Sequence, residues 1–148
     1  MPEREQQLFN FFNEINIIAQ LSSNEFERAL PDGLTQSQFS VLNWFVRVDS
    51  VASPGRLARA FMVTRGAMTN TLKKLEQKGY IEVTPDEASG RSKKITMTAT
   101  GRQIRDQAIE ATFPLFAELA QGFPVDELKH LMPALQKLRT FLDARRYK

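Results

Sequence analysis

Cysteine is absent from this 148-residue sequence, and histidine occurs only once, as His130. Without cysteine there can be no disulfide, no thiolate zinc site and no cysteine nucleophile. A multi-histidine metal site cannot form within one chain, and a Ser-His-Asp site would have to use His130. A glycine-rich phosphate-binding loop is also missing. These absences indicate a protein that is not an enzyme and has no metal or other cofactor.

Long apolar runs are missing too. No stretch approaches the roughly 20 residues that a membrane helix needs, and the acidic N-terminus lacks the apolar segment of a signal peptide. Hydrophobic residues make up 42% of the sequence and charged residues 25%, which is typical of a folded globular chain. We therefore expect one soluble, cytoplasmic domain without a membrane partner.

Charge is distributed unevenly along the chain. Residues 1–46 carry a net charge of −4, residues 47–105 carry +7, and residues 106–148 are neutral, for a formal total of +3. A basic middle segment between acidic and neutral ends predicts a surface that binds a polyanion. A solvated, lysine-rich surface is the simpler alternative when charge is the only evidence.

Helix-start signals divide the first 80 residues. A helix is expected over about 2–29, and Pro31-Asp32-Gly33 forms a turn after it. Thr35 and Gln38 have the spacing of a capping box, and Ser53-Pro54 predicts the start of a short helix. Thr64 then caps a helix that ends at Gly79.

After residue 80 the periodicity of apolar residues changes from helical to alternating. Ile81 and Val83, then Ile95 and Met97, alternate with polar residues on either side of a polar segment over 85–94. This pattern predicts a two-stranded hairpin with a long charged loop. Two further helices follow, from about 98 and from about 125. Pro114 predicts a kink or interruption in the first, and Pro133 predicts a bend in the second.

The order of these elements is that of a winged helix-turn-helix. In that arrangement the helix at about 54–61 braces the helix at about 64–79, whose outer face can enter a DNA major groove. Arginine and asparagine can make bidentate contacts to bases, and lysine contacts phosphates. An arginine at the hairpin tip can enter a minor groove, where the potential is most negative. The predicted DNA-binding residues are Thr64, Arg65, Gly66, Thr69, Asn70, Lys73, Lys74, Arg91 and Lys93. For Lys93 and Lys94, contact with DNA and a role in solubility alone are equal alternatives.

The chain resembles the MarR family (multiple antibiotic resistance regulators). The resemblance rests on an ordered set of motifs between about residues 34 and 101: Leu34-Thr35-x-x-Gln38-Phe39-x-Val41-Leu42, Leu57-Ala58, Val63-Thr64, Leu75-Glu76-x-Lys78-Gly79-Tyr80-Ile81, Asp86, Gly90-Arg91 and Thr98-x-x-Gly101. It implies a homodimer with interlocked terminal helices, a pseudo-palindromic operator and, in many members, release by a small aromatic or acidic ligand. Ser89 and Met62 depart from the family pattern, which often has aspartate and glycine there.

The resulting fold prediction is mainly α with a small β-hairpin wing. Residues 1–33 form an N-terminal dimerisation helix, residues 34–98 the winged helix-turn-helix, and residues 99–148 the C-terminal dimerisation helices. The terminal segments carry more apolar surface than one small domain can bury, which favours a dimer interface over an intrachain core. The function expected is that of a sequence-specific DNA-binding regulator, a repressor. The alternative is a winged-helix protein-interaction module that does not bind DNA.

Two weaker candidate sites remain. Trp44 lies off the main apolar stripe of its helix and could line a ligand pocket with Phe12, Ile15 and Arg47, although we favour simple core packing. Glu127-x-x-His130 has the spacing of half a carboxylate-bridged metal site. It stands alone on an apolar helix, so a capping or surface role is the preferred interpretation.

Overall fold

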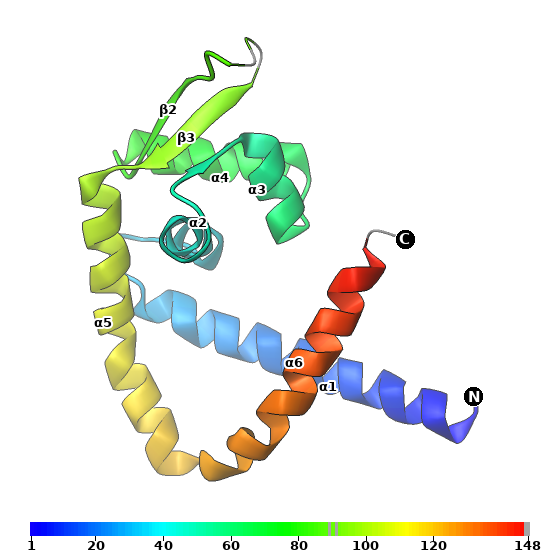
Figure 1. Cartoon of the computed structure of the whole chain (residues 1–148). Coiled ribbons are helices and arrows are strands. Elements are labelled where there is room, and N and C mark those ends of the chain that lie inside the picture. Colours follow the sequence, from blue (N-terminus) through cyan, green and yellow to red (C-terminus); the bar gives the residue numbers. More distant parts are fainter. Residues whose placement is uncertain (89, 91, 147–148) are drawn as a thin grey trace. The chain divides into compact units, whose positions relative to one another are not determined.

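The computed structural model describes residues 1–88, 90 and 92–146. Its elements in chain order are α1 (Glu3–Ala29), α2 (Gln36–Arg47), β1 (Val51–Ala52), α3 (Pro54–Phe61), α4 (Arg65–Gln77), β2 (Ile81–Pro85), β3 (Lys93–Met97), α5 (Ala99–Gly122) and α6 (Asp126–Arg145), as Figure 1 shows. The mainly helical fold with a small sheet matches the expected class. None of the described helices combines the length and apolar character of a membrane span.

Hydroxyl side chains begin the helices of the middle segment, as expected. The Thr35 hydroxyl accepts the Gln38 amide at 3.1 Å and the Gln38 side chain accepts the Thr35 amide at 3.2 Å, which completes the capping box of α2. Ser53 caps α3 by accepting the Arg56 amide at 3.1 Å. Thr98 caps α5 by accepting the Gly101 amide at 3.0 Å. These bonds satisfy amides that the first helical turn leaves unpaired.

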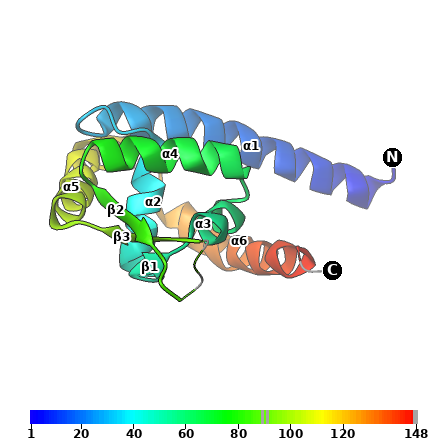
Figure 2. The ribbon, with the colours of Figure 1, turned by 90° about the horizontal axis from the view of Figure 1, so that it is seen from above.

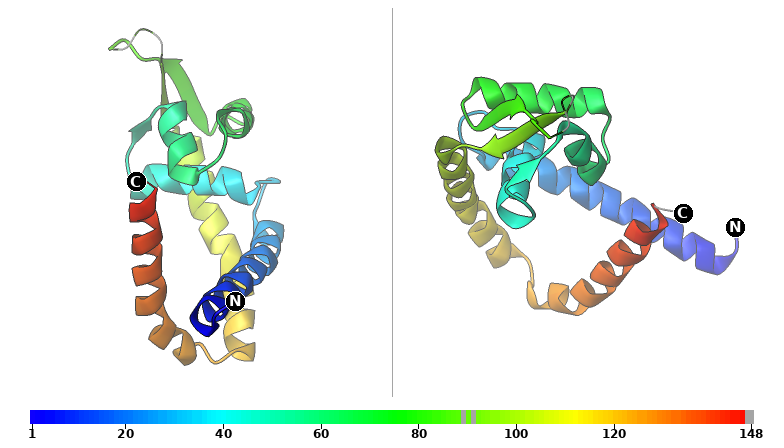
Figure 3. Two further views of the ribbon diagram at one scale, coloured as in Figure 1. Left: turned by 90° about the vertical axis from the view of Figure 1, so that its right-hand side faces the viewer. Right: turned by 45° about the horizontal axis from the view of Figure 1, so that its top comes forward.

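The sheet has three antiparallel strands in the order β1-β3-β2, rather than the two strands that the alternation pattern predicts. β2 and β3 form the hairpin, with Ile81 opposite Met97 and Pro85 opposite Lys93. β1 adds the pairs Val51 with Thr96 and Ala52 with Ile95. Because only two residues of β1 take part, the strand is too short to show a period in the sequence. The hairpin projects beyond α2, α3 and α4 (Figure 3).

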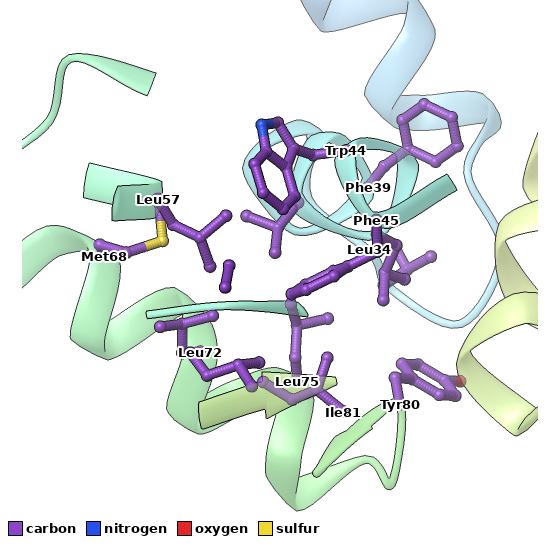
Figure 4. Packing of buried hydrophobic residues seen from close by; sticks show 14 of the residues in the cluster. Leu34, Phe39, Trp44, Phe45, Leu57, Met68, Leu72, Leu75, Tyr80 and Ile81 are labelled. Atoms are coloured by element: carbon purple, nitrogen blue, oxygen red, sulfur yellow. The ribbon is translucent and has the colours of Figure 1, made fainter. Parts of the chain in front are cut away.

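The core lies between α2, α3, α4 and the sheet. Leu42, Leu57, Leu75 and Ile95 are fully buried, one from each of these elements. Figure 4 shows the side chains of α2, α3 and α4 pointing toward one another, with Phe45 between α2 and α4. Burying a leucine-sized side chain contributes about 1.5–3 kcal/mol, so this cluster holds α4 firmly against α3.

Two compact units make up the chain, residues 1–112 and residues 113–148. In the first, α1 has no buried residue and contacts the core through Phe26, whose ring lies edge-on to Phe39 at 5.3 Å. In the second, α6 also has no buried residue. Helix α5 continues through Pro114, where an interruption was one of the expected outcomes, and the boundary between the units falls beside this proline.

Candidate nucleic-acid interface

Helix α4 has one buried face and one exposed face. Met68, Leu72 and Leu75 point into the core. The opposite face is exposed to solvent and carries every residue of this helix for which DNA contact was predicted: Arg65, Gly66, Thr69, Asn70, Lys73 and Lys74. Arg65, Lys73 and Lys74 are cationic, and Arg65, Thr69 and Asn70 can hydrogen-bond base edges. The face is therefore chemically suited to read a DNA groove.

The start of α4 is fixed by its cap and by the turn before it. The Thr64 hydroxyl accepts the Ala67 amide at 3.1 Å. In the preceding turn Met62 has a φ of 53°, a left-handed conformation that usually favours glycine. The Val63 amide donates to the Ala58 carbonyl at 3.0 Å and closes this turn. The turn thus forms with methionine at the position where the family often has glycine.

The hairpin loop is organised by Asp86. The Asp86 carboxylate accepts the Ala88 amide at 3.1 Å, and its carbonyl accepts the Gly90 amide at 3.0 Å. The Asp86 amide donates in turn to the Ser92 carbonyl at 3.0 Å. Asp86 therefore holds the described part of the loop backbone in place. Lys93 and Lys94 are exposed on β3, and the predicted DNA contact Arg91 lies outside the described residues.

A groove of about 520 Å³ separates α4 from the hairpin. Its walls come from the start of α3, the outer face of α4 and the two strands, which lie on one face of the first unit (Figure 2). The lining residues are Ser53, Pro54, Gly55, Arg65, Thr69, Leu72, Lys73, Glu76, Val83, Ser92, Lys93 and Ile95. Arg65, Lys73 and Lys93 bring positive charge to it, and Glu76 brings a carboxylate. This balance favours a polyanion such as a phosphate backbone.

Ser53, Pro54 and Gly55 were not among the predicted interface residues. The sequence identified Ser53-Pro54 only as a helix start, and that same signal places the N-terminus of α3 at the groove. Glu76 and Val83 were also missed, because an acidic and an apolar side chain give no sign of a nucleic-acid surface. Their place in the groove follows from the packing of the hairpin against α4.

Trp44 is buried in the core, as the favoured interpretation expected. Its ring lies edge-on to Phe45 at 5.4 Å and has the Arg56 guanidinium over it at 4.9 Å. Arg56 also donates to the Asp49 carboxylate at 2.8 Å, and this bond lowers the pKa of Asp49 below its ordinary value. The cation at Trp44 is thus Arg56 and not Arg47.

The other residues of the possible ligand pocket are not among the contacts of Trp44 described above. Phe12 and Ile15 are half-buried on α1, where Phe12 contacts Phe11 edge-on at 6.4 Å, and Arg47 is exposed at the end of α2. A second cavity of about 350 Å³ is lined by residues of α2, α3 and α4 and includes none of these four. The pocket therefore stays a prediction. Within the described residues, no three metal-ligating side chains come together, at His130 or elsewhere.

Comparison with known proteins places these features in a family. Residues 32–92 match the model of the MarR family. The chain is 32% identical over 110 residues to the transcriptional activatory protein BadR of Rhodopseudomonas palustris, covering 72% of this chain and 63% of BadR. It is 37% identical to the HTH-type transcriptional repressor Mb2911 of Mycobacterium bovis, covering 73% of this chain and 77% of the repressor.

A solved structure shows the same architecture. A mutant of MarR from E. coli, complexed with operator DNA, superposes with a TM-score of 0.76 at 25% identity, covering 89% of this chain and 95% of that protein. On the family match, the identity to the mycobacterial repressor and this superposition, the chain belongs to the MarR family of transcriptional regulators.

Proposed function

We propose that this protein is a sequence-specific DNA-binding regulator that acts as a homodimer on a pseudo-palindromic operator. The observation that carries the proposal is the cationic groove between the outer face of α4 and the hairpin. A helix in the major groove would place Arg65, Thr69 and Asn70 against base edges, and Lys73 and Lys93 against phosphates. The E. coli relative is solved in complex with operator DNA, which supports the proposal that this chain binds DNA.

The homodimer is supported by the apolar surface that the single chain leaves uncovered. On α1, Leu8, Ile18 and Leu21 are 52%, 59% and 63% exposed. In the second unit, large apolar side chains are exposed along α5 and α6, namely Phe113, Phe116, Leu119, Leu128, Leu131, Met132, Phe141 and Leu142. So much exposed apolar surface is unusual for a soluble monomer and marks an interface. Sedimentation should give twice the 16.9 kDa mass of one chain, and a monomer would contradict the proposal.

DNA binding can be tested by fluorescence anisotropy with operator fragments selected from random duplexes. We expect the logarithm of the affinity to fall linearly with the logarithm of salt concentration, because bound phosphates release counterions. Lys73→Gln should reduce this slope by about one, and Asn70→Ala should relax discrimination at one base position at a cost of about 1–3 kcal/mol. Lys129→Gln on α6 removes the same charge from a residue that does not line the groove, so it should leave binding unchanged.

The alternative function is a protein-interaction module with the same fold. If this alternative is right, no DNA duplex should bind with a steep dependence on salt. The anisotropy titration at rising salt concentration therefore decides between the two functions. Repression is the direction of regulation that we propose, as named for the mycobacterial relative, although BadR is named as an activator. Deleting the gene should then raise transcription from promoters that the protein occupies, and a fall would indicate activation instead.

A small aromatic or acidic effector completes the proposal. An effector that binds a dimer geometry different from the DNA-bound one must weaken DNA binding, and DNA must weaken effector binding equally. A thermal-shift screen with aromatic carboxylic acids should identify a compound that stabilises the free protein. Because its ligand is DNA, we propose that the protein acts in the cytoplasm.

A further inference from the structure

Gly55, the second residue of α3, is buried beneath an arginine side chain. A Cβ atom built on Gly55 would lie 2.6 Å from Arg65 Nη2 and 3.5 Å from Arg65 Cζ. The guanidinium group of Arg65 therefore occupies the space that any larger residue at position 55 would need. Arg59 Nη1 also lies near this point, at 3.5 Å, which is an ordinary contact distance.

Arg65 is the first residue of α4, and both it and Gly55 line the groove between α4 and the hairpin. Arginine has many rotamers, and fixing a side chain of this kind on binding costs about 0.5–1.5 kcal/mol. The bare backbone at Gly55 leaves room for the planar guanidinium of Arg65 to lie there before DNA binds, and such a position would restrain the side chain. The glycine thus reduces the conformational entropy that Arg65 would lose in the complex.

We propose that Gly55 is a positioning residue for DNA recognition, which acts by holding the Arg65 guanidinium at the edge of the groove. The inference rests on the proposed DNA-binding function and adds to it a determinant on the bracing helix α3. The residue needs no contact with DNA of its own, because its effect passes through Arg65.

Gly55→Ala tests the proposal. The added methyl group meets the far end of a flexible side chain, so the fold can accept it while Arg65 must leave its place. We expect operator affinity to fall about three- to tenfold, which corresponds to the cost of ordering one freed side chain. Gly122→Ala is the matched control: within one chain its Cβ would meet nothing within 4 Å, and it lies in the second compact unit. Because this unit belongs to the proposed dimerisation helices, sedimentation first checks that the variant is still a dimer, and its operator affinity should then equal that of the wild type.

Double-mutant cycles with the two nearby arginines separate this mechanism from a general disturbance of α3. In an Arg65→Ala background, Gly55→Ala should have no further effect on affinity. In an Arg59→Ala background its effect should be the same as in the wild type, because Arg59 is only in ordinary contact with the added methyl group. A second readout needs no DNA: ¹⁵N relaxation of the Arg65 Nε–H group in the free protein should report a restrained side chain that becomes mobile in Gly55→Ala.

The outcomes distinguish the two proposals. A wild-type protein that binds no duplex overturns the proposed function and, with it, this inference. Wild-type binding together with a Gly55→Ala variant of equal or tighter affinity overturns the inference alone. The inference is also overturned if Gly55→Ala weakens operator binding equally in the wild-type and Arg65→Ala backgrounds. It is overturned too if the Arg65 side chain is equally mobile in the free wild type and the free Gly55→Ala variant.

Discussion

The Tyr80 hydroxyl donates a hydrogen bond to the carboxylate of Asp32, 48 residues earlier in the chain. The Lys78 ammonium group donates to the Asp32 carbonyl at 2.6 Å and lies 3.7 Å from its carboxylate. These contacts tie the turn before α2 to the segment that follows α4. The hydrogen bond from Tyr80 and the charge of Lys78 lower the pKa of Asp32, and burial, with the bond to Asp32, raises the pKa of Tyr80 to about 12.

Tyr80 should ionise late in an alkaline titration. Its folded pKa of about 12 lies above the ordinary value of 10.0, so its contribution to stability is complete below pH 10 and is lost as the pH rises toward 12. The sequence has only two tyrosines, so ultraviolet absorbance near 295 nm can resolve a delayed second step. The step should be missing in Tyr80→Phe. Ionisation of both tyrosines near pH 10 in the folded wild type would contradict the burial of Tyr80 and its bond to Asp32 together.

Asp32 should contribute to stability at neutral pH and lose that contribution in acid. Because its folded pKa lies below the ordinary value of 3.8, the contribution is present above about pH 4 and disappears as the pH falls through the folded value. Urea unfolding of the wild type and of Asp32→Asn should therefore differ at pH 7 and converge below pH 4. A difference that stays constant from pH 7 to pH 3 would contradict this account.

Gly101→Ala should destabilise the fold by about 1–3 kcal/mol, the usual range for overpacking. A Cβ atom at Gly101 would overlap the Tyr80 carbonyl oxygen and lie 2.9 Å from Met97 Cγ. Since that carbonyl also accepts the Thr98 amide at 3.1 Å, the backbone has little freedom to move away. Thermal unfolding measures the effect. If the variant melts at the same temperature as the wild type, the start of α5 does not pack against the Tyr80 carbonyl.

Gly66→Ala should have the opposite effect on stability. Its Cβ would meet nothing within 4 Å, and alanine in a helix restricts the unfolded chain, so we expect a gain of about 0.4–1 kcal/mol. Gly66 is also a predicted DNA-binding residue, and without a side chain its backbone can approach DNA closely, so the same variant should bind its operator more weakly. A variant with a higher melting temperature and unchanged operator affinity would show that Gly66 is not part of the DNA interface.

Thr35 and Thr64 form a matched pair of helix caps. Each hydroxyl accepts an amide three residues later at 3.1 Å, so alanine at either position should cost about 1 kcal/mol of unfolding free energy. Only Thr64 begins the helix that faces the groove, so only Thr64→Ala should also weaken operator binding. If both variants lose the same operator affinity, the loss is caused by lower stability of the fold and not by the place of Thr64 at the start of α4.

Much of the winged-helix segment could be predicted from its sequence, because its helix starts depend on local chemistry. The capping bonds of Thr35, Ser53 and Thr64 involve residues three apart, and such spacings are visible in the sequence. The exposed face of α4 followed from the same periodicity that placed Met68, Leu72 and Leu75 inside.

Features that depend on distant residues could not be predicted. β1 is defined by its pairing with β3, more than 40 residues later, and not by its own two residues. The same holds for the contact of Tyr80 with Asp32, and for Asn43, whose side-chain oxygen accepts two bonds from Arg105 at 3.0 and 3.2 Å. The space over Gly55 depends on the rotamer of an arginine in another helix, and no local pattern encodes that.

The neutral caps of α3 and α4 have an electrostatic consequence. Neither helix has an acidic residue in its first turn, whereas α1 and α6 both do. A helix dipole places about half a positive charge at its N-terminus, and a carboxylate there would cancel it. Ser53 and Thr64 accept bonds from the first amides of α3 and α4 without supplying negative charge. The positive electrostatic potential at the groove is therefore larger than its arginines and lysines alone would produce. Part of the attraction for an anion is therefore built into the backbone, where substitution of surface cations cannot remove it.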